Sequence, residues 1–221
     1  MTGAFAPTAR KIGLSVAGSE TFEPRAESYD TVADRVARSG ARGIFLSAPT
    51  SEGAGRLIRA LRARLGARGV IIGTDIFLDV PEVLQATGPA AVGMYVTNTS
   101  IPVERLPGVE RRLVRRFNAT QPATGAETLW QPETMRAVQV VLDAIARSDG
   151  TRASVLEQLR ATRAEGGVFG SFRFDRFGDI TPSAVAIHRV TGETKPGSTT
   201  TPSLRGAVLD RVIRIPEQLS P

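Results

Sequence analysis

The pattern of apolar residues is most regular between residues 43 and 78. A short apolar run at 44–46 leads into a stretch with apolar residues at helical spacing, and a second apolar run follows at 70–72. This order predicts a β-strand, an amphipathic helix and a second strand, which together form the βαβ unit of a parallel sheet. Because both runs are continuous rather than alternating, we expect the strands to be covered on both faces. The apolar face of the helix consists of Leu57, Ile58, Leu61 and Leu65.

Neighbouring segments extend this unit into an α/β lobe over residues 10–97. Turn residues and prolines punctuate it, and Thr50 or Ser51 is expected to cap the central helix. The other expected elements are a frayed start at 1–10, a strand at 12–17, a helix at 26–39, a short helix at 81–87 with Asp79 or Val80 near its cap, and a strand at 92–96.

Residues 98–108 contain two prolines and are predicted to form a hinge-like crossing. Beyond them the pattern changes to helices over 109–165, a β-hairpin over 166–191, and a linker with a terminal strand over 192–221. The expected elements are helices at 109–117, 133–147 and 152–163, the last capped by Ser154, hairpin strands at 168–174 and 184–190, a flexible connection at 191–205, and a strand at 208–215.

The composition narrows the possible chemistry. The chain has no cysteine, which excludes disulfides, cysteine–zinc sites and thiol nucleophiles. Its net charge of +6 comes almost entirely from arginines spread along helices, and aromatic residues are only 5% of the chain. We therefore expect solvated helix faces and no nucleic-acid partner. Phosphate contact is the alternative for the densest basic cluster, which is formed by Arg111, Arg112, Arg115 and Arg116.

No export signal and no membrane-spanning stretch is visible in the sequence. Hydrolase, zinc-protease and Walker motifs are also absent, so we expect no enzyme activity, cofactor or metal. His188, the single histidine, lies within an apolar strand pattern and is expected to be structural or on the surface. The glycines at 53 and 55 precede or begin a helix, where they could face an anion or simply permit close packing.

Six segments resemble, in the same order, parts of one known family. They are SETFEPRAESYDTVADRVARSGARGIFLSAP, SEGAGRLIRAL, VIIGTDIF, GPAAVGMYVT, VQVVLDAIARSDGTRASVLEQLRATR and FGSFRFDRFGDITP. The family is that of the type I periplasmic solute-binding proteins, in the branched-chain amino-acid class. The resemblance covers roughly residues 10–192. It implies an α/β fold with an open, mostly parallel sheet and flanking helices, followed by a helical segment and a C-terminal β-hairpin.

The resemblance also implies two lobes that close on a ligand, of which this chain matches only the later part. We expect the chain to start within the second lobe, so that it is a fragment, a truncated gene product or the tail of a larger polypeptide. The helices at 109–117 and 133–147 would then lack the sheet that they normally cover. Their apolar stripes are expected to be exposed or to mediate self-association.

Asp75 is the strongest candidate for a binding residue. It follows a predicted strand and Thr74, so its carboxylate is expected at the carboxyl edge of the sheet, where ligands bind in open α/β folds. In the family that it resembles, an acidic residue at such a position pairs with the ammonium group of the ligand. The alternative is that Asp75 caps the following turn.

Two further regions are candidates for ligand contact. The loop formed by Pro49, Thr50 and Ser51 takes the place where amino-acid-binding relatives often carry an aromatic residue, so it suits a small polar ligand or serves as a helix cap. Trp130, the only tryptophan, could line a cleft, whereas Met135 lies on the apolar stripe of its helix and is expected in the core.

These features predict the ligand-binding module of an ABC-transporter solute-binding protein for amino acids or related small molecules. The alternative is a sensory or regulatory ligand-binding domain within a larger protein. The partner would be a membrane permease in the first case and a fused signalling domain in the second. The resemblance implies a periplasmic or extracellular location, and a cytoplasmic one if Met1 is the native start.

Overall fold

The structure, a computed structural model, describes residues 2–48, 51–99, 102–120, 131–166, 170–193 and 204–215. The chain divides into two compact units. The first unit comprises residues 1–98 and 187–210, and the second comprises residues 99–186 and 211–221. The first division falls where the predicted crossing begins. None of the helices in the described ranges is long and apolar enough to cross a membrane.

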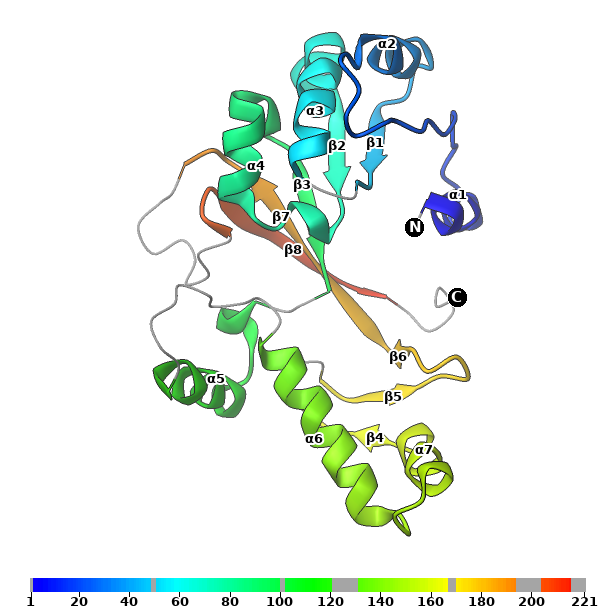
Figure 1. Ribbon diagram of the computed structural model, residues 1–221, viewed down its shortest axis with the longest axis vertical. Helices are drawn as coiled ribbons and strands as arrows, with labels where there is room; N and C mark the ends of the chain where they lie inside the picture. The colour runs from blue at the N-terminus through cyan, green and yellow to red at the C-terminus, as the bar shows by residue number, and fades with distance from the viewer. Residues whose placement is uncertain are drawn as a thin grey trace. The chain divides into compact units, whose positions relative to one another are not determined.

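A five-stranded sheet with the strand order β1-β2-β3-β7-β8 organises the first unit (Figure 1). Its parallel strands are β1 (Gly43–Leu46), β2 (Val70–Gly73) and β3 (Tyr95–Asn98). The strands β7 (Ser183–Val190) and β8 (Ala207–Ile215) complete it, and each runs across the division between the units. The predicted βαβ unit and terminal strand are therefore confirmed.

The helices of the first unit bury a continuous apolar core. Around the central helix α3 (Ser51–Leu65), which packs against α2 and α4, Leu57, Ile58 and Leu61 are each at most 3% exposed. The other helical elements are α1 (Thr2–Lys11), α2 (Asp30–Arg38), α4 (Val80–Thr87) and the 3-10 turns η1 (Gly66–Arg68), η2 (Asp75–Phe77) and η3 (Gly88–Ala91).

Close packing explains one of the glycines near the start of α3. A Cβ atom added to Gly55 would lie 2.9 Å from the Cβ of Ala86 on α4 and 3.1 Å from its carbonyl oxygen. Such distances are too short for carbon, so α3 and α4 can approach this closely only because residue 55 is glycine. The packing alternative is therefore confirmed for Gly55.

The second unit combines helices with a small antiparallel sheet. Helix α6 (Gln131–Arg147) packs against α7 (Arg152–Arg160), as Figure 1 shows. The sheet has the order β4-β5-β6, and its strands are β4 (Arg163–Ala164), β5 (Phe172–Phe174) and β6 (Ile180–Thr181). The helical elements η4 (Val103–Arg105) and α5 (Gly108–Thr120) lie earlier in the chain.

One face of α6 is apolar and exposed. The α6 stripe, which we define as Val138, Val141, Leu142 and Ile145, has exposed fractions between 42% and 59%. On α5, Val109 and Leu113 are also exposed, whereas Val114 is buried against Leu106. The expected exposure is confirmed for the α6 stripe and for Val109 and Leu113 of α5, whereas Val114 of α5 is covered.

The predictions for the N-terminus are wrong. Residues 2–11 form a helix rather than a frayed start, and residues 12–17 are not a strand. The helix ends in a Schellman arrangement at Gly13, whose φ is 81°, where the Leu14 N–H donates to the Ala9 carbonyl at 2.9 Å. Ile12 and Leu14 are then more than half exposed, so their apolar character does not reflect a buried strand.

Some predicted boundaries also shift. Helix α2 begins at Asp30 rather than at residue 26, and β3 begins at Tyr95 rather than at residue 92, because residues 92–93 turn after η3 at Gly93 with φ 82°. Helix α7 ends at Arg160 rather than at residue 163. Its N-cap is Thr151, whose side chain accepts a hydrogen bond from the Ser154 N–H, so the prediction of Ser154 as the cap was wrong.

The predicted hairpin has a different partner. Strand β5 pairs with β6, not with the strand at 184–190, and the turn between them is closed by Asp175, which accepts from the N–H groups of Phe177 and Asp179. Pro182 follows, and it has no N–H to continue the ladder. The next strand, β7, joins the five-stranded sheet instead. Most of the predicted connection at 191–205 lies outside the described residues.

Candidate functional site

The three parallel strands of the first unit end at a common edge. Leu46 pairs with Gly73, and the β2–β3 register pairs Gly73 with Val96. Continuing this register by two residues brings together the short segments 47–48 and 74–75 with residues 97–98, which end β3. All three contribute small or polar residues at the carboxyl edge, where open α/β sheets bind their ligands.

Backbone hydrogen bonds hold the turn after β2. The Thr74 N–H donates to the Leu46 carbonyl at 3.2 Å, and the Thr74 carbonyl accepts from the Phe77 N–H at 3.1 Å. The Thr97 hydroxyl donates to the Gly73 carbonyl at 3.1 Å. Thr74 itself is only 5% exposed, and its backbone hydrogen bonds stabilise the turn. Direct contact between Thr74 and a ligand stays a prediction.

Asp75 is exposed at the start of η2. Its carboxylate makes no hydrogen bond or ion pair within the part of the chain that the structure describes. The cap of the next helix is Asp79, whose Oδ1 accepts from the Glu82 N–H at 3.2 Å. The capping alternative therefore applies to Asp79 and not to Asp75, which leaves the Asp75 carboxylate presented to solvent at the sheet edge.

Asn98 was missed by sequence reasoning. It ends β3 and is 3% exposed, and the strand register places it in the same row as Asp75. The prediction ended this strand at residue 96 and assigned residue 98 to the crossing. A polar side chain directly after an apolar run on a neighbouring parallel strand was the available signal, as it was for Asp75.

Several predicted residues cannot be placed. Pro49, Thr50 and Trp130 lie outside the described residues, and Ser51 begins α3 without a described side chain. Their roles in binding remain predictions. Met135 is half-buried on α6, and His188 is 2% exposed within β7, which agrees with a structural rather than a surface position for this histidine.

The basic cluster of α5 is exposed. Arg111, Arg112, Arg115 and Arg116 all lie at the surface, as a solvated face requires.

Within the ranges that the structure covers, no three acidic or histidine side chains gather in a way that could hold a metal ion. The candidate site therefore consists of a sheet edge and a carboxylate, which is an arrangement suited to binding a cationic group.

Comparisons with known proteins agree with this fold. A family model described as "Periplasmic binding protein" matches residues 1–194. No match was found among curated proteins. A leucine-binding protein, LivK, from Thermotoga maritima is 21% identical with a TM-score of 0.72, covering 96% of this chain and 55% of that structure.

Two further solved structures are similar. A putative branched-chain amino acid ABC transporter from Rhodospirillum rubrum is 27% identical with a TM-score of 0.63, covering 82% of this chain and 51% of that one. An ABC-transporter solute-binding protein from R. palustris in complex with 4-hydroxybenzoate is 17% identical with a TM-score of 0.66, covering 96% and 55%. The chain thus spans about half the length of the solved structures that it matches.

Proposed function

The chain belongs to the periplasmic binding protein family, with a type I fold, and we propose that it binds amino acids or related small molecules as part of an ABC-transporter solute-binding protein. Solute-binding proteins of this kind are not enzymes, and we propose the same for this chain. Its location would be periplasmic, and its macromolecular partner would be a membrane permease.

The observation that carries this proposal is the position of Asp75. Its carboxylate is exposed at the carboxyl edge of three parallel strands and is not used to cap η2 or α4. A carboxylate in this position can accept charge-assisted hydrogen bonds from an ammonium group, and such bonds are shorter and stronger than neutral ones. A ligand with an ammonium group is therefore favoured over a neutral or purely anionic one.

Ligand binding would shift a conformational equilibrium toward a closed state. A ligand can do this only as far as it binds the closed state more tightly than the open state. Thr74 and the loop of Pro49, Thr50 and Ser51 border Asp75 in sequence or at the neighbouring strand end, and we propose that they complete the contacts around the ligand. We propose Trp130 as an additional contact.

The test is a thermal-shift screen of the 221-residue chain against amino acids, with 4-hydroxybenzoate and small carboxylates included. A ligand that binds the native state raises the melting temperature, and at a concentration of 100 times Kd it stabilises by about 2.7 kcal/mol. We expect a shift with at least one amino acid. Asp75→Asn, which removes the charge at nearly constant size, should abolish it.

Asp79→Asn is the matched control, because it removes the same charge from the same loop. Asparagine is also a good helix cap, so the start of α4 is preserved. An equal loss of the shift in both variants would mean that general charge, not the Asp75 carboxylate, attracts the ligand. A cooperative melt without any ligand shift would overturn binding by this chain alone.

The fluorescence of Trp130 gives an independent readout, because it is the only tryptophan. If Trp130 contacts the ligand, an amino acid that shifts the melting temperature should also change the emission intensity or wavelength. A ligand that stabilises the protein with unchanged emission would remove Trp130 from the site while leaving the role of Asp75 intact.

A further inference from the structure

We propose that α5 is an interfacial helix that binds the surface of a membrane containing anionic phospholipids. The helix contacts η4 and α6, and in Figure 1 it lies on the opposite side of α6 from α7. Its sequence, GVERRLVRRFNAT, interleaves apolar residues with arginines. This inference goes beyond ligand binding and uses no residue of the sheet edge that carries Asp75.

One side of α5 attaches the helix to the second unit. Val114 is 4% exposed and packs with Leu106 and Val103. Glu110 lies four residues before Val114 and therefore shares its side of the helix. It is half-buried, and its Oε2 is shielded from solvent. The one acidic residue in the sequence of α5 thus belongs to the attached side of the helix.

The outer side of α5 presents a short row of apolar side chains. Val109 and Leu113 are four residues apart, so they are neighbours on one face, and they are 65% and 51% exposed. Val114 is turned by about 100° from Leu113 around the helix axis. The contact that attaches α5 therefore leaves Val109 and Leu113 uncovered.

Arginines lie beside this apolar row. Arg112 follows Val109 by three residues and Arg116 follows Leu113 by three, so each arginine is a neighbour of one apolar side chain. Both arginines are exposed, and so is Arg115. Among the residues that the structure describes, these three arginines form no ion pair. Their positive charge is therefore available to an external anion.

An anionic bilayer surface matches both the arginines and the apolar row. Guanidinium groups donate paired hydrogen bonds to phosphate, and the acyl region beneath the headgroups buries apolar side chains. Arginine can keep its charged end among the headgroups while its methylene stem lies along the apolar surface. Dissolved phosphate, by contrast, would satisfy the arginines and leave Val109 and Leu113 in water. The phosphate contact considered for this basic cluster would then be made with lipid headgroups.

The test is flotation of the 221-residue chain with vesicles, in low salt. The vesicles consist of phosphatidylcholine alone or of phosphatidylcholine with about one third phosphatidylglycerol. Flotation separates vesicle-bound protein from self-associated protein, which does not rise in the gradient. We expect binding to the anionic vesicles to be at least about tenfold stronger than to the neutral ones, because each basic residue near an anionic surface strengthens binding about fivefold. Binding should weaken as salt is raised to about 1 M.

Two variants separate the contribution of charge from that of insertion. Arg112→Gln with Arg116→Gln should weaken binding to anionic vesicles at least about tenfold. Leu113→Ser should weaken it about fivefold or more, because the variant no longer has a leucine side chain to bury. Arg112→Lys with Arg116→Lys keeps both charges and should stay within about threefold of the wild type. All three positions are exposed, so each variant should melt at the temperature of the wild type.

Helix α7 offers a matched control in the same unit. Arg152, Leu156 and Arg160 are four residues apart in turn and are all exposed, but Glu157 adjoins Leu156 and α7 has only these two arginines. Arg152→Gln with Arg160→Gln, and separately Leu156→Ser, should leave vesicle binding within about threefold, because charges outside the contact are screened.

Three results would overturn the proposal. Equal weakening by the α5 and α7 variants would show that net charge, not α5, drives binding. A loss in the arginine double variant with no effect of Leu113→Ser would indicate a purely electrostatic surface, as an acidic protein partner would need. Equal binding to both kinds of vesicle, or no binding by a chain that melts cooperatively, would exclude an anionic membrane surface.

Failure here is distinguishable from failure at Asp75. Asp75→Asn should float with anionic vesicles as the wild type does. The double variant Arg112→Gln with Arg116→Gln should retain the thermal shift with amino acids, because it leaves the sheet edge of the first unit unchanged.

Discussion

Helices α3 and α6 have the same kind of sequence but opposite surroundings. Both carry apolar residues at helical spacing over at least 15 residues. On α3 this face is buried beside α2 and α4, and Ile58 is fully buried. On α6 the corresponding stripe is exposed, and Ile145 is 47% exposed. An amphipathic pattern thus identifies the apolar face of a helix, but whether that face is buried depends on a neighbouring element.

The largest expected effect comes from making the same substitution, isoleucine to alanine, on both helices. Ile58→Ala removes apolar volume from a closed core and should lower the free energy of unfolding by about 2–5 kcal/mol. Ile145→Ala removes the same atoms from an exposed face and should change it by less than about 0.5 kcal/mol. Urea unfolding followed by circular dichroism measures both values. Similar losses for the two variants would mean that the α6 stripe is covered in solution.

Glycine substitutions give the next largest contrast. A Cβ atom on Gly73, in β2, would lie against the Cε of Met94 and 2.5 Å from the Cδ2 of Phe77, both of which are fully buried. Gly73→Ala should therefore cost about 1–3 kcal/mol through overpacking. At the start of α5, a Cβ on Gly108 would meet only the flexible ends of Arg112, at 3.6 Å, and Arg111, at 4.0 Å.

Gly108→Ala should be neutral or should stabilise by up to about 1 kcal/mol, because alanine reduces the entropy of the unfolded chain. Thermal and urea unfolding of the two variants give the comparison. If Gly73→Ala were as stable as the wild type, the packing of Met94 and Phe77 over β2 would be looser than the structure indicates.

Self-association provides a third test, because in a purified protein an exposed apolar stripe can be buried only against another copy of the chain. We expect the apparent mass in sedimentation velocity to rise with protein concentration. The double variant Leu142→Lys with Ile145→Lys should weaken association at least about tenfold, which corresponds to about 1.4 kcal/mol. Leu156→Lys, on α7, is the matched control because Leu156 is 47% exposed but lies outside the stripe. Association that is unchanged in the double variant would exclude the stripe as its cause.

Local patterns of apolar residues were sufficient to predict β1, α3, β2 and α6. The β1-α3-β2 unit followed from two continuous apolar runs around one helical stripe, and α6 followed from its own stripe. The errors arose where pairing partners decide the outcome. Among the residues that the structure describes, the segment 12–17 pairs with no strand, and the strand at 184–190 joins the large sheet rather than β5.

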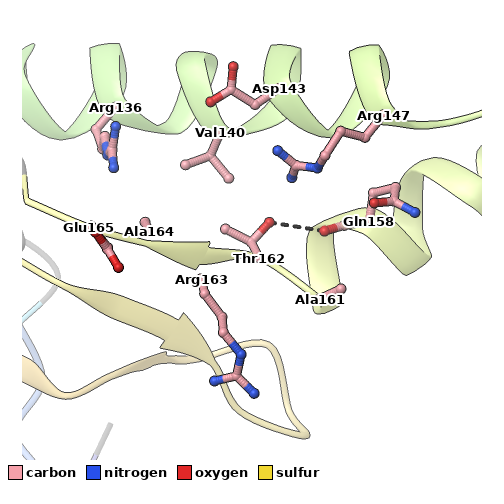
Figure 2. A pocket seen from close by; sticks show the side chains of 10 residues that line it. All are labelled: Arg136, Val140, Asp143, Arg147, Gln158, Ala161, Thr162, Arg163, Ala164 and Glu165. Carbon is pink, nitrogen blue, oxygen red and sulfur yellow. Dashed lines mark hydrogen bonds between the residues drawn. The ribbon is translucent and has the colours of Figure 1, made fainter.

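The same limit applies to the candidate site. The position of Asp75 at the sheet edge followed from its place two residues after β2. Asn98 was assigned to the crossing instead, and its place in the same row as Asp75 depends on the register between β2 and β3, which neither strand encodes alone. The cavity of about 410 Å³ between α6, α7 and β4 (Figure 2) could not be predicted either, because these elements come together only through tertiary packing.

The smallest expected effect concerns surface carboxylates, one from each unit. In the first unit, a hydrogen bond from Arg35 to Glu20, at 2.8 Å, lowers the pKa of Glu20. In the second unit, hydrogen bonds from the backbone N–H and the hydroxyl of Thr151 lower the pKa of Asp149. A pKa lowered by folding stabilises the protein above the unfolded pKa of about 4, and this stabilisation is lost as the pH falls through the folded pKa.

Glu20→Gln and Asp149→Asn imitate the protonated forms, so each should lower the melting temperature slightly at pH 6, and this effect should diminish as the pH falls through the folded pKa. Both groups are exposed, so the differences will be small. Salt separates the two causes, because about 1 M salt shortens the Debye length to about 3 Å and screens the charge of Arg35. The Glu20 effect should therefore shrink in salt more than the Asp149 effect, whose donors are the neutral N–H and hydroxyl of Thr151. An equal loss of both effects in salt would show that Asp149 acts through distant arginines rather than through the turn before α7.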